Sequence, residues 1–358
     1  MIRHVFIIVP SDHPTGPVKG AYALANALVD ERPVTLVTLR EGPGASAPLD
    51  RRVLRRSLAD VGSRWWNRLT TYRSMLREAG GRSHVGSISM CFSADMVNCW
   101  SAADAVTCAS VRGNLMKNYR LDYGLPGMPL AVGHLAALRR ADHIVAITTA
   151  MAAQIASYAG KAPIVIGNFI DEPALDVYRS STRREGPLRF VFVGSLTTRK
   201  QPLVVLRAVR ELKQRGLDVR LDVVGVGPLS KAVEDAVTSL SLQGLVTLHG
   251  HVAEPFSIVA ASDAMVLPSL SEGIARSALE ALHLGVPCLV RNVDGNAELI
   301  PTASHGALFD NDRELPEKML AVAERSRGVT AARESLLPAG FRQREQARRY
   351  LRLLEGPL

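Results

Sequence analysis

One short stretch of the chain, residues 264–290, combines a strand, a turn, a helix and a second strand. The apolar run at 264–267 predicts a buried strand, and the run at 288–290 predicts another. The residues between them begin with a small-residue turn and continue as a helix: Pro268-Ser-Leu-Ser-Glu-Gly-Ile-Ala-Arg-Ser-Ala-Leu-Glu280. Because two buried strands joined through a helix are typical of parallel pairing, the stretch predicts an α/β fold with a parallel sheet.

The same alternation of apolar strands and amphipathic helices continues on both sides of this stretch. In the first half we expect strands at 5–9, 34–39, 143–147 and 164–166, and helices at 21–30 and 149–159. In the second half we expect strands at 189–193, 218–224 and 246–249, helices at 202–215 and 231–240, and a short element at 296–300. The pattern predicts two Rossmann-like domains facing a central cleft, with the site outside the carboxyl ends of the strands.

The length of 358 residues also fits two domains rather than one core. A polar, charged stretch between Asp171 and Pro187 predicts an interdomain linker. We therefore expect an N-terminal domain at 1–175 and a C-terminal domain at 176–340. The tail at 341–358 contains an amphipathic helix.

Composition narrows the class of protein. The chain has 47% hydrophobic and 22% charged residues, as in globular proteins, and it contains no apolar run long enough to span a membrane. We expect no cleavable signal and therefore a cytoplasmic protein, with peripheral attachment to the inner face of the plasma membrane as an alternative. Four cysteines lack metal-type spacing and are interpreted as reduced thiols in the core: Cys91, Cys99, Cys108 and Cys288.

Two carboxylates, Glu272 and Glu280, lie eight residues apart around the expected start of a helix. The first N–H groups of a helix have no intrahelical partner, and with the helix dipole they favour phosphate. Carboxylates accept hydrogen bonds from vicinal hydroxyls. The combination predicts a site for a ligand that carries both phosphate and sugar hydroxyls.

Three glycine-containing turns follow predicted strands, at 16–20, 194–200 and 225–228. None matches the dinucleotide fingerprint GxGxxG or the P-loop, which disfavours hydride transfer and NTP hydrolysis. The second turn ends in Arg199 and Lys200, where a strand end would aim both cations at the site. An Arg and a Lys together suit a diphosphate.

Several motifs between Phe190 and Ile300 occur in a characteristic order: Phe192-Val-Gly194 with Lys200, Val223-Val-Gly-Val-Gly-Pro, Gly250-His-Val, Ser262-Asp-Ala-Met-Val-Leu-Pro-Ser, Ser271-Glu-Gly with the E-x7-E spacing, and Asp294-Gly-Asn-Ala-Glu298. In this order they resemble the donor-binding half of the GT-B glycosyltransferases, in particular the retaining, metal-independent family 4. The first half resembles that family more loosely, through the loop at Gly16.

The resemblance implies that the domain at 1–175 binds the acceptor and that the domain at 176–340 binds the nucleotide sugar. It also implies that the helix at 341–358 crosses back to the N-terminal domain, and it implies a role for each matching residue. Glu272 would hold hydroxyls of the transferred sugar, and Glu280 would hold the ribose. Lys200 and Arg199, with Glu272, would form the catalytic group and neutralise the diphosphate without a metal ion. The remaining donor-binding residues implied by the resemblance are Gly16, Gly194, Ser195, Gly225, His251, Val252, Gly273, Ile274, Ala275, Arg276 and Ser277.

The chain departs from the family pattern at two positions. Ser195 stands where the family usually has arginine, and Arg199 or Arg276 would replace that charge. Ser110-Val-Arg112-Gly-Asn stands where many relatives have a histidine after a strand. Arg112 is therefore a candidate on the acceptor side, with a surface arginine as the alternative.

The activity implied by the resemblance is transfer of a hexose or N-acetylhexosamine, with retention of configuration. The donor would be a nucleotide-diphosphate sugar, with UDP favoured over GDP, and no metal or other cofactor would be required. The acceptor would be a growing polysaccharide or lipid-linked glycan of the lipopolysaccharide or capsule type. The alternatives are a nucleotide-sugar epimerase of the same fold, which needs proton-transfer groups at the sugar ring, and a non-catalytic binding module.

A separate feature is the basic segment at 51–82, which holds nine arginines against two acids and carries +7 of the net charge of +9. Residues 51–79 also show helical spacing of apolar residues and contain Trp65 and Trp66. Arginine and tryptophan on an amphipathic helix are typical of binding to an anionic membrane surface. A core-packed helix with a solvated arginine face is the alternative. No nucleic-acid partner is expected, because no such binding motif accompanies the arginines.

Overall fold

The computed structural model describes residues 1–13, 15–42, 48–62, 64–179, 186–327 and 333–356. The chain divides into two compact units. The first contains residues 1–171 and 340–358, and the second contains residues 172–339. The tail helix therefore belongs with the first unit, although the whole second unit separates it from the rest of that unit in the sequence.

The first unit is built on a seven-stranded parallel sheet in the order β3-β2-β1-β4-β5-β6-β7. Its strands are β1 (His4–Ser11), β2 (Val34–Arg40), β3 (Leu54–Ser57), β4 (Val85–Met90), β5 (Val106–Val111), β6 (His143–Ala146) and β7 (Ile164–Val165). The order reverses next to β1, with β2 on one side and β4 on the other. A Rossmann-like sheet binds ligands at such a reversal, at the carboxyl ends of the strands.

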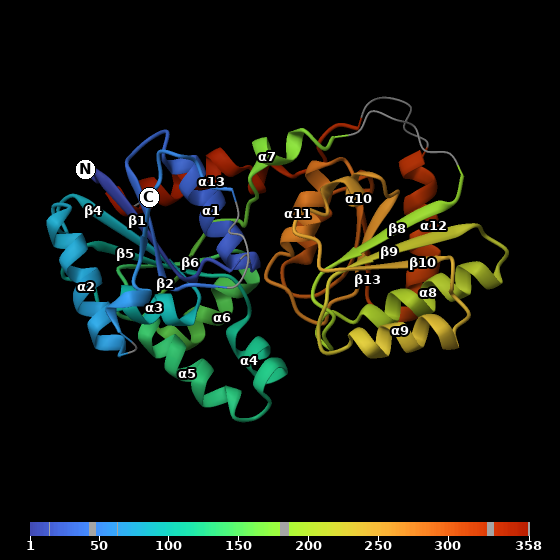
Figure 1. Cartoon of the computed structure of the whole chain (residues 1–358), viewed down its shortest axis with the longest axis horizontal. Helices are drawn as coiled ribbons and strands as arrows, with labels where there is room; N and C mark the ends of the chain where they lie inside the picture. The colour runs from blue at the N-terminus through green and yellow to red at the C-terminus, as the bar shows by residue number, and fades with distance from the viewer. Residues whose placement is uncertain (14, 43–47, 63, 180–185, 328–332, 357–358) are drawn as a thin grey trace. The chain divides into compact units, whose positions relative to one another are not determined.

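Helices cover both faces of this sheet (Figure 1). They are α1 (Gly16–Leu28), α2 (Trp65–Glu78), α3 (Phe92–Cys99), α4 (Leu115–Tyr123), α5 (Gly127–Leu138), α6 (Thr149–Ala159) and α13 (Gln343–Glu355). One core layer joins Val5, Ile7 and Val9 of β1 to α1 and α13. The opposite layer joins Phe6 and Ile8 to α2 and α3. Alternation along β1 therefore supplies both cores.

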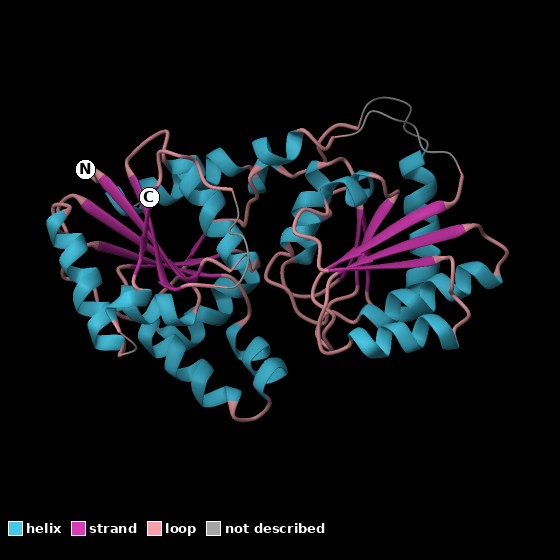
Figure 2. Ribbon diagram, viewed as in Figure 1, coloured by secondary structure: helices cyan, strands magenta, loops and turns pink. Residues whose placement is uncertain are grey.

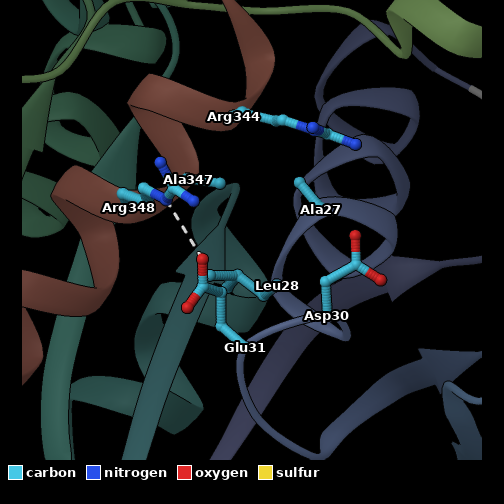
Figure 3. A pocket seen from close by; sticks show the side chains of 7 residues that line it. All are labelled: Ala27, Leu28, Asp30, Glu31, Arg344, Ala347 and Arg348. Atoms are coloured by element: carbon cyan, nitrogen blue, oxygen red, sulfur yellow. Dashed lines mark hydrogen bonds and ion pairs between the residues drawn. The ribbon is translucent and has the colours of Figure 1, made fainter.

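The tail helix α13 packs against α1 (Figure 3). Arg348 pairs with Glu31 at 3.0 Å. In the buried layer, Gln343 donates a hydrogen bond to the carbonyl of Ala23 at 2.8 Å. The hydroxyls of Tyr350 and Ser110 are 2.6 Å apart, although 240 residues separate them. These contacts make α13 part of the first unit.

The segment 51–79 is not one helix. Residues 54–57 form strand β3, which pairs with β2, and a 3-10 turn, η1 (Ala59–Val61), precedes α2. The helical spacing therefore gave a wrong prediction for residues 54–57. Without β3, the edge of β2 would have unpaired N–H and C=O groups, and pairing with β3 satisfies them. In α2 the residues Leu69, Tyr72 and Leu76 are buried in the core, as the core-packed alternative expects, whereas Trp66 is 58% exposed.

The second unit contains a six-stranded parallel sheet in the order β10-β9-β8-β11-β12-β13, covered by helices on both faces (Figure 2). Its strands are β8 (Leu188–Val193), β9 (Val219–Val224), β10 (Val246–Gly250), β11 (Ala264–Leu267), β12 (Cys288–Arg291) and β13 (Gly306–Phe309). Its helices are α7 (Glu172–Asp176), α8 (Pro202–Gln214), α9 (Ser230–Ser239), α10 (Phe256–Ala260), α11 (Arg276–His283) and α12 (Leu315–Arg327). Four 3-10 turns complete the described elements: η2 (Asn296–Leu299), η3 (Ala303–His305), η4 (Asp312–Glu314) and η5 (Ala339–Phe341), the last beginning at the final residue of this unit.

The predicted alternation of strands and helices is confirmed, with two local differences. Helix α1 begins at Gly16 rather than near 21, because Pro17 lies in its first turn, where a missing N–H breaks no hydrogen bond. The expected linker begins with the short helix α7, and residues 180–185 lie outside the described part of the chain. Pro14 of the first predicted loop also lies outside it.

Candidate functional site

The second unit has its own topological reversal, between β8 and β11. Strands β9 and β10 extend the sheet on one side of this pair, and β12 and β13 extend it on the other. In a sheet of this kind, ligands bind at such a reversal, outside the carboxyl ends of the strands. The loops that follow β8 and β11 are joined directly, because the N–H of Leu270 donates to the carbonyl of Arg199 at 2.8 Å.

Two glycine turns meet at this edge. A Cβ atom on Gly225 would lie 1.9 Å from the carbonyl oxygen of Gly194, and the φ of Gly225 is +139°, so no other residue fits there. Gly194 is different, because a Cβ atom on it would meet its nearest neighbours at 3.8 Å or more. Packing within the described residues therefore requires glycine at 225 but not at 194, whose N–H donates to the carbonyl of Val224 at 3.0 Å.

Glu272 is the centre of a buried charge cluster in the loop after β11. Its side chain is buried, and Lys200 Nζ donates a short hydrogen bond to its Oε1. The Arg199 guanidinium lies 3.7 Å from its Oε2 and donates to the Ser271 carbonyl at 3.1 Å. The two cations that follow β8 are thus held against the first of the two predicted acids.

The charge state of Glu272 follows from these neighbours. Burial alone raises the pKa of the carboxyl group, but the charges of Lys200 and Arg199 outweigh burial and hold the pKa of Glu272 below its usual value. Glu272 is therefore a carboxylate near neutral pH. It can accept hydrogen bonds from hydroxyl groups and can orient both cations.

Asp294 is a residue of this cluster that was not among the predicted site residues. Its Oδ2 accepts hydrogen bonds from the Ser271 hydroxyl and from the N–H of Glu272, both at 2.8 Å. Asp294 has a φ of +49°, which is uncommon outside glycine. The sequence signal was the turn Asp294-Gly-Asn, since aspartate before glycine tolerates a positive φ.

Helix α11 starts directly after the buried loop that carries Glu272. The capping position, Ala275, offers no side-chain acceptor, and the first turn contains no acid. Arg276 occupies the first helical position and donates from Nε to Glu280 Oε1 at 3.1 Å, with both side chains largely buried. The predicted Arg276 and Glu280 are therefore paired with each other. The uncapped N–H groups of the first turn favour an anion.

The remaining predicted residues fall at several places. Gly273, Ile274 and Ala275 lie in the buried loop between β11 and α11, and Ser277 is half-buried in the first turn of α11. Ser195 follows Gly194 after β8. His251 and Val252 follow β10, whose last residue, Gly250, accepts a hydrogen bond from the N–H of Gly225 at 2.7 Å. Gly16 and Arg112 belong to the first unit.

Arg112 lines a pocket of about 230 Å³ at the reversal of the first sheet. It is not the surface arginine of the alternative interpretation, because its guanidinium donates to Asn168 at 2.7 Å and its Nε is buried without a hydrogen-bond partner among the described residues. The pocket is also lined by Cys91, which has a φ of +78°. Such a backbone is strained for a residue with a side chain, and strain of this kind concentrates at binding sites.

The same pocket contains a buried polar chain that the sequence did not reveal. Asp95 Oδ2 is 2.8 Å from Nε2 of His134, and Nδ1 of His134 is 3.2 Å from the hydroxyl of Tyr119. Asp95 and His134 are both nearly fully buried. With the Nε2 proton of His134 donated to Asp95, Nδ1 accepts a hydrogen bond from the Tyr119 hydroxyl and orients it. Burial raises the pKa of Cys91 to about 12, which keeps this thiol neutral.

Within the described ranges, no three or more His, Cys, Asp or Glu side chains are grouped so that they could hold a metal ion. The cations Lys200, Arg199 and Arg276 are the positive groups of the second unit's site. The other three cysteines, Cys99, Cys108 and Cys288, are buried, as expected for core thiols.

Residues 176–328 match the family model described as Glycosyl transferases group 1. The match covers most of the second unit. One relative is the UDP-Gal:alpha-D-GlcNAc-diphosphoundecaprenol alpha-1,3-galactosyltransferase of Escherichia coli, with 34% identity over 124 residues, which cover 34% of this chain and 32% of the relative. Another is the putative colanic acid biosynthesis glycosyltransferase WcaL of Escherichia coli strain K12, with 28% identity over 38% of this chain and 36% of the relative. The chain spans about a third of the length of the curated relatives it matches.

Among solved structures, the Anabaena protein HepE in complex with UDP has a TM-score of 0.76 at 15% identity, over 98% of this chain and 99% of that protein. At this identity the similarity concerns the fold. Together with the two parallel Rossmann-like sheets, it confirms the predicted α/β fold class, GT-B. The arrangement of the two halves about a central cleft stays a prediction.

Proposed function

We propose that this protein is a retaining, metal-independent glycosyltransferase that uses a nucleotide-diphosphate sugar. The observation that carries the proposal is the buried Glu272 carboxylate, held by Lys200 and Arg199 beside the uncapped start of α11. The carboxylate, the cations and a helix start without a capping side chain match the sugar hydroxyls and the diphosphate of such a donor. The match of residues 176–328 to the group 1 family supports glycosyl transfer in general.

In this proposal the site of the second unit binds the donor. Glu272 accepts hydrogen bonds from hydroxyls of the transferred sugar. Glu280 accepts them from the ribose, and the turn at Gly194 and Ser195 approaches the diphosphate. The turns at Gly225 and at His251 and Val252 lie next to these groups and would contact the nucleotide.

The chemical step exchanges one bond at the anomeric carbon for another. The bond from that carbon to the diphosphate oxygen breaks, and the acceptor hydroxyl oxygen forms a new bond on the same face. The acceptor proton passes to the departing phosphate oxygen, so no protein base is needed and the configuration is retained. Lys200, Arg199 and Arg276 stabilise the negative charge that develops on the diphosphate, which is the work that a metal ion does in other enzymes.

The substrates are proposed by analogy and chemistry. We propose a UDP-sugar carrying a hexose or N-acetylhexosamine, since the first relative named above uses UDP-Gal. We propose a polysaccharide or lipid-linked glycan as the acceptor, since that relative acts on a sugar attached to diphosphoundecaprenol. A cytoplasmic protein, attached peripherally to the inner face of the membrane, would meet both substrates.

A panel of nucleotide sugars tests the donor. UDP-galactose, UDP-glucose, UDP-N-acetylglucosamine and GDP-mannose would be screened by the shift in the midpoint of thermal unfolding. We expect stabilisation by at least one UDP-sugar, and loss of that stabilisation in the variant Glu280→Gln. No shift with any donor would contradict the assignment.

Product analysis separates the alternatives. A glycosyltransferase transfers the sugar to an acceptor, or slowly to water, and releases the nucleoside diphosphate. An epimerase returns a nucleotide sugar with an inverted centre, and a binding module returns the donor unchanged. Chromatography of the reaction with the stabilising donor therefore decides among the three, and EDTA that leaves turnover unchanged would support independence from metals.

A further inference from the structure

The helices α4 and α5 of the first unit form a hairpin with an unusual composition. From Tyr123 to Leu138 the sequence contains no Asp, Glu, Lys or Arg. Helix α5 buries Ala131, His134 and Leu135 on its inner side. Its outer side carries no charged residue, although helices at a protein surface normally have a polar outer face.

The outer side of this hairpin is exposed and apolar. The exposed fraction rises from 42% at Leu121 and 48% at Leu130 to 62% at Tyr123 and 78% at Leu125. Of the thirteen large hydrophobic residues that the described part of the chain exposes, six lie on or beside this hairpin: Phe92, Leu121, Tyr123, Leu125, Leu130 and Val132. Single exposed hydrophobic residues are ordinary, but a cluster of this kind marks an interaction surface.

Basic residues flank this apolar surface at both ends. Lys117 and Arg120 lie on α4 before it, and the exposed Arg139 and Arg140 follow α5 directly. In the sequence, Asp122 is the one acid between 115 and 141. An apolar surface bordered by Lys and Arg complements the anionic headgroups and acyl chains of a bilayer. In the described ranges, no helix is both long enough and apolar enough to cross a membrane, so an interfacial position is the relevant one.

We infer that the outer side of the α4–α5 hairpin, formed by Leu121, Tyr123, Leu125, Leu130 and Val132, lies on the surface of an anionic lipid bilayer. This surface differs from the segment at 51–79 that the sequence indicated. There the apolar stripe of α2 is buried in the core, and Arg52, Arg73 and other arginines are paired with acids of the same unit.

The position of the hairpin has a consequence for the acceptor. Tyr119 and Tyr123 of α4 and His134 of α5 line the 230 Å³ pocket that also contains Arg112. A lipid-borne molecule held at the bilayer would meet this pocket with its polar end. There the Tyr119 hydroxyl and the Arg112 guanidinium could contact a sugar or a phosphate group. This step rests on the proposed function and makes a lipid-linked acceptor the preferred class.

Vesicle flotation with the full chain tests the surface without requiring turnover. Vesicles of phosphatidylcholine alone would be compared with vesicles that also contain phosphatidylglycerol, at low and at high salt. We expect binding to the anionic vesicles that weakens with salt. The double variant L125D/L130D should reduce the bound fraction about tenfold or more, because two apolar anchors become negative charges.

Three controls make the result specific. Val177→Asp changes a residue that is 81% exposed in the second unit and should float like the wild type. Trp66→Ala removes the exposed tryptophan of α2 and should also float like the wild type. Circular dichroism and the thermal unfolding midpoint check that L125D/L130D is folded, which its exposed positions favour.

Three outcomes would overturn the inference. Flotation of L125D/L130D at the wild-type level would exclude the hairpin, and loss of flotation in Trp66→Ala alone would assign binding to the segment at 51–79. If the wild type does not float and is a dimer, and L125D/L130D is a monomer, the surface is a contact between two copies of the chain. Flotation without release of nucleoside diphosphate from any donor would leave the membrane surface intact and contradict the proposed function instead.

Discussion

Asp294 accepts a hydrogen bond from the backbone N–H of Glu272 at 2.8 Å, and the same carboxylate oxygen accepts one from the Ser271 hydroxyl. The loop after β12 thereby holds the loop after β11 in place. Lys200 and Arg199 hold the opposite side of Glu272 from the loop after β8. The proposed sugar-binding carboxylate is thus positioned by three separate loops, which follow β8, β11 and β12. The site residues of the first two loops were predicted, and Asp294 of the third was not.

Replacing Asp294 with alanine should lower kcat for sugar transfer by about 10–100-fold, because a small displacement of a positioned group has effects of this size. The dissociation constant for UDP should change much less, since Asp294 does not contact the nucleotide in our proposal. Asp310→Ala, on a neighbouring exposed position, is the matched control. Equal losses in both variants would show a general effect on stability rather than on Glu272.

The pKa of Glu272 gives a pH dependence with a definite sign. Its pKa is lower in the folded protein than in the unfolded chain, so its ionised form stabilises the fold above the unfolded value and that contribution is lost as pH falls through the folded pKa. The thermal unfolding midpoint of the wild type should exceed that of Glu272→Gln at pH 7, and the difference should shrink as the pH falls below 4.5, the ordinary pKa of a glutamate. A difference that grows with acidity would contradict the assignment of Glu272 as a carboxylate.

Arg276 should contribute to turnover in place of the charge that Ser195 lacks. We expect Arg276→Ala to lose transfer activity by roughly tenfold or more, as for other groups that stabilise developing charge. Arg207→Ala removes an exposed arginine from α8 of the same unit and should retain activity. Wild-type turnover in Arg276→Ala would remove the proposed role.

The two glycines at the sheet edge should respond differently to alanine. Gly225→Ala places a Cβ atom against the carbonyl of Gly194 at a positive φ, so we expect an unfolding free energy lower by about 1–3 kcal/mol or more. Gly194→Ala has room for the added atom and should fold normally, but it should weaken UDP-sugar binding measured by calorimetry. Normal donor affinity in Gly194→Ala would show that the ligand does not approach this backbone.

Much of the fold was predictable because its signal is local. Each strand of the second unit is a short apolar run, and each helix follows it with its own periodicity, so the pattern needed no knowledge of distant contacts. The segment at 51–79 failed for the opposite reason. Its apolar spacing fitted a helix, but residues 54–57 pair with the edge of β2, and that hydrogen-bonding demand lies outside the segment.

The candidate site divides in the same way. Glu272, Lys200, Arg199 and Glu280 were identifiable because each lies in or beside a turn or helix start whose chemistry can be read locally. The chain Asp95–His134–Tyr119 was not, since its members come from α3, α5 and α4 and each looks ordinary in its own helix. The exposed side of α5 was hidden too, because an apolar helix in a sequence is expected to be buried.

The sequence by itself determined the α/β class, the two-unit organisation and the acids and cations of the second unit. These follow from periodicity, turn chemistry and residue type, which act over a few neighbouring residues. Only the tertiary structure decided that Arg276 pairs with Glu280, that Asp294 holds Glu272, and that the hairpin rather than the segment at 51–79 exposes an apolar surface. The physical reason is that burial and pairing depend on which distant elements pack together, and a local pattern does not contain that information.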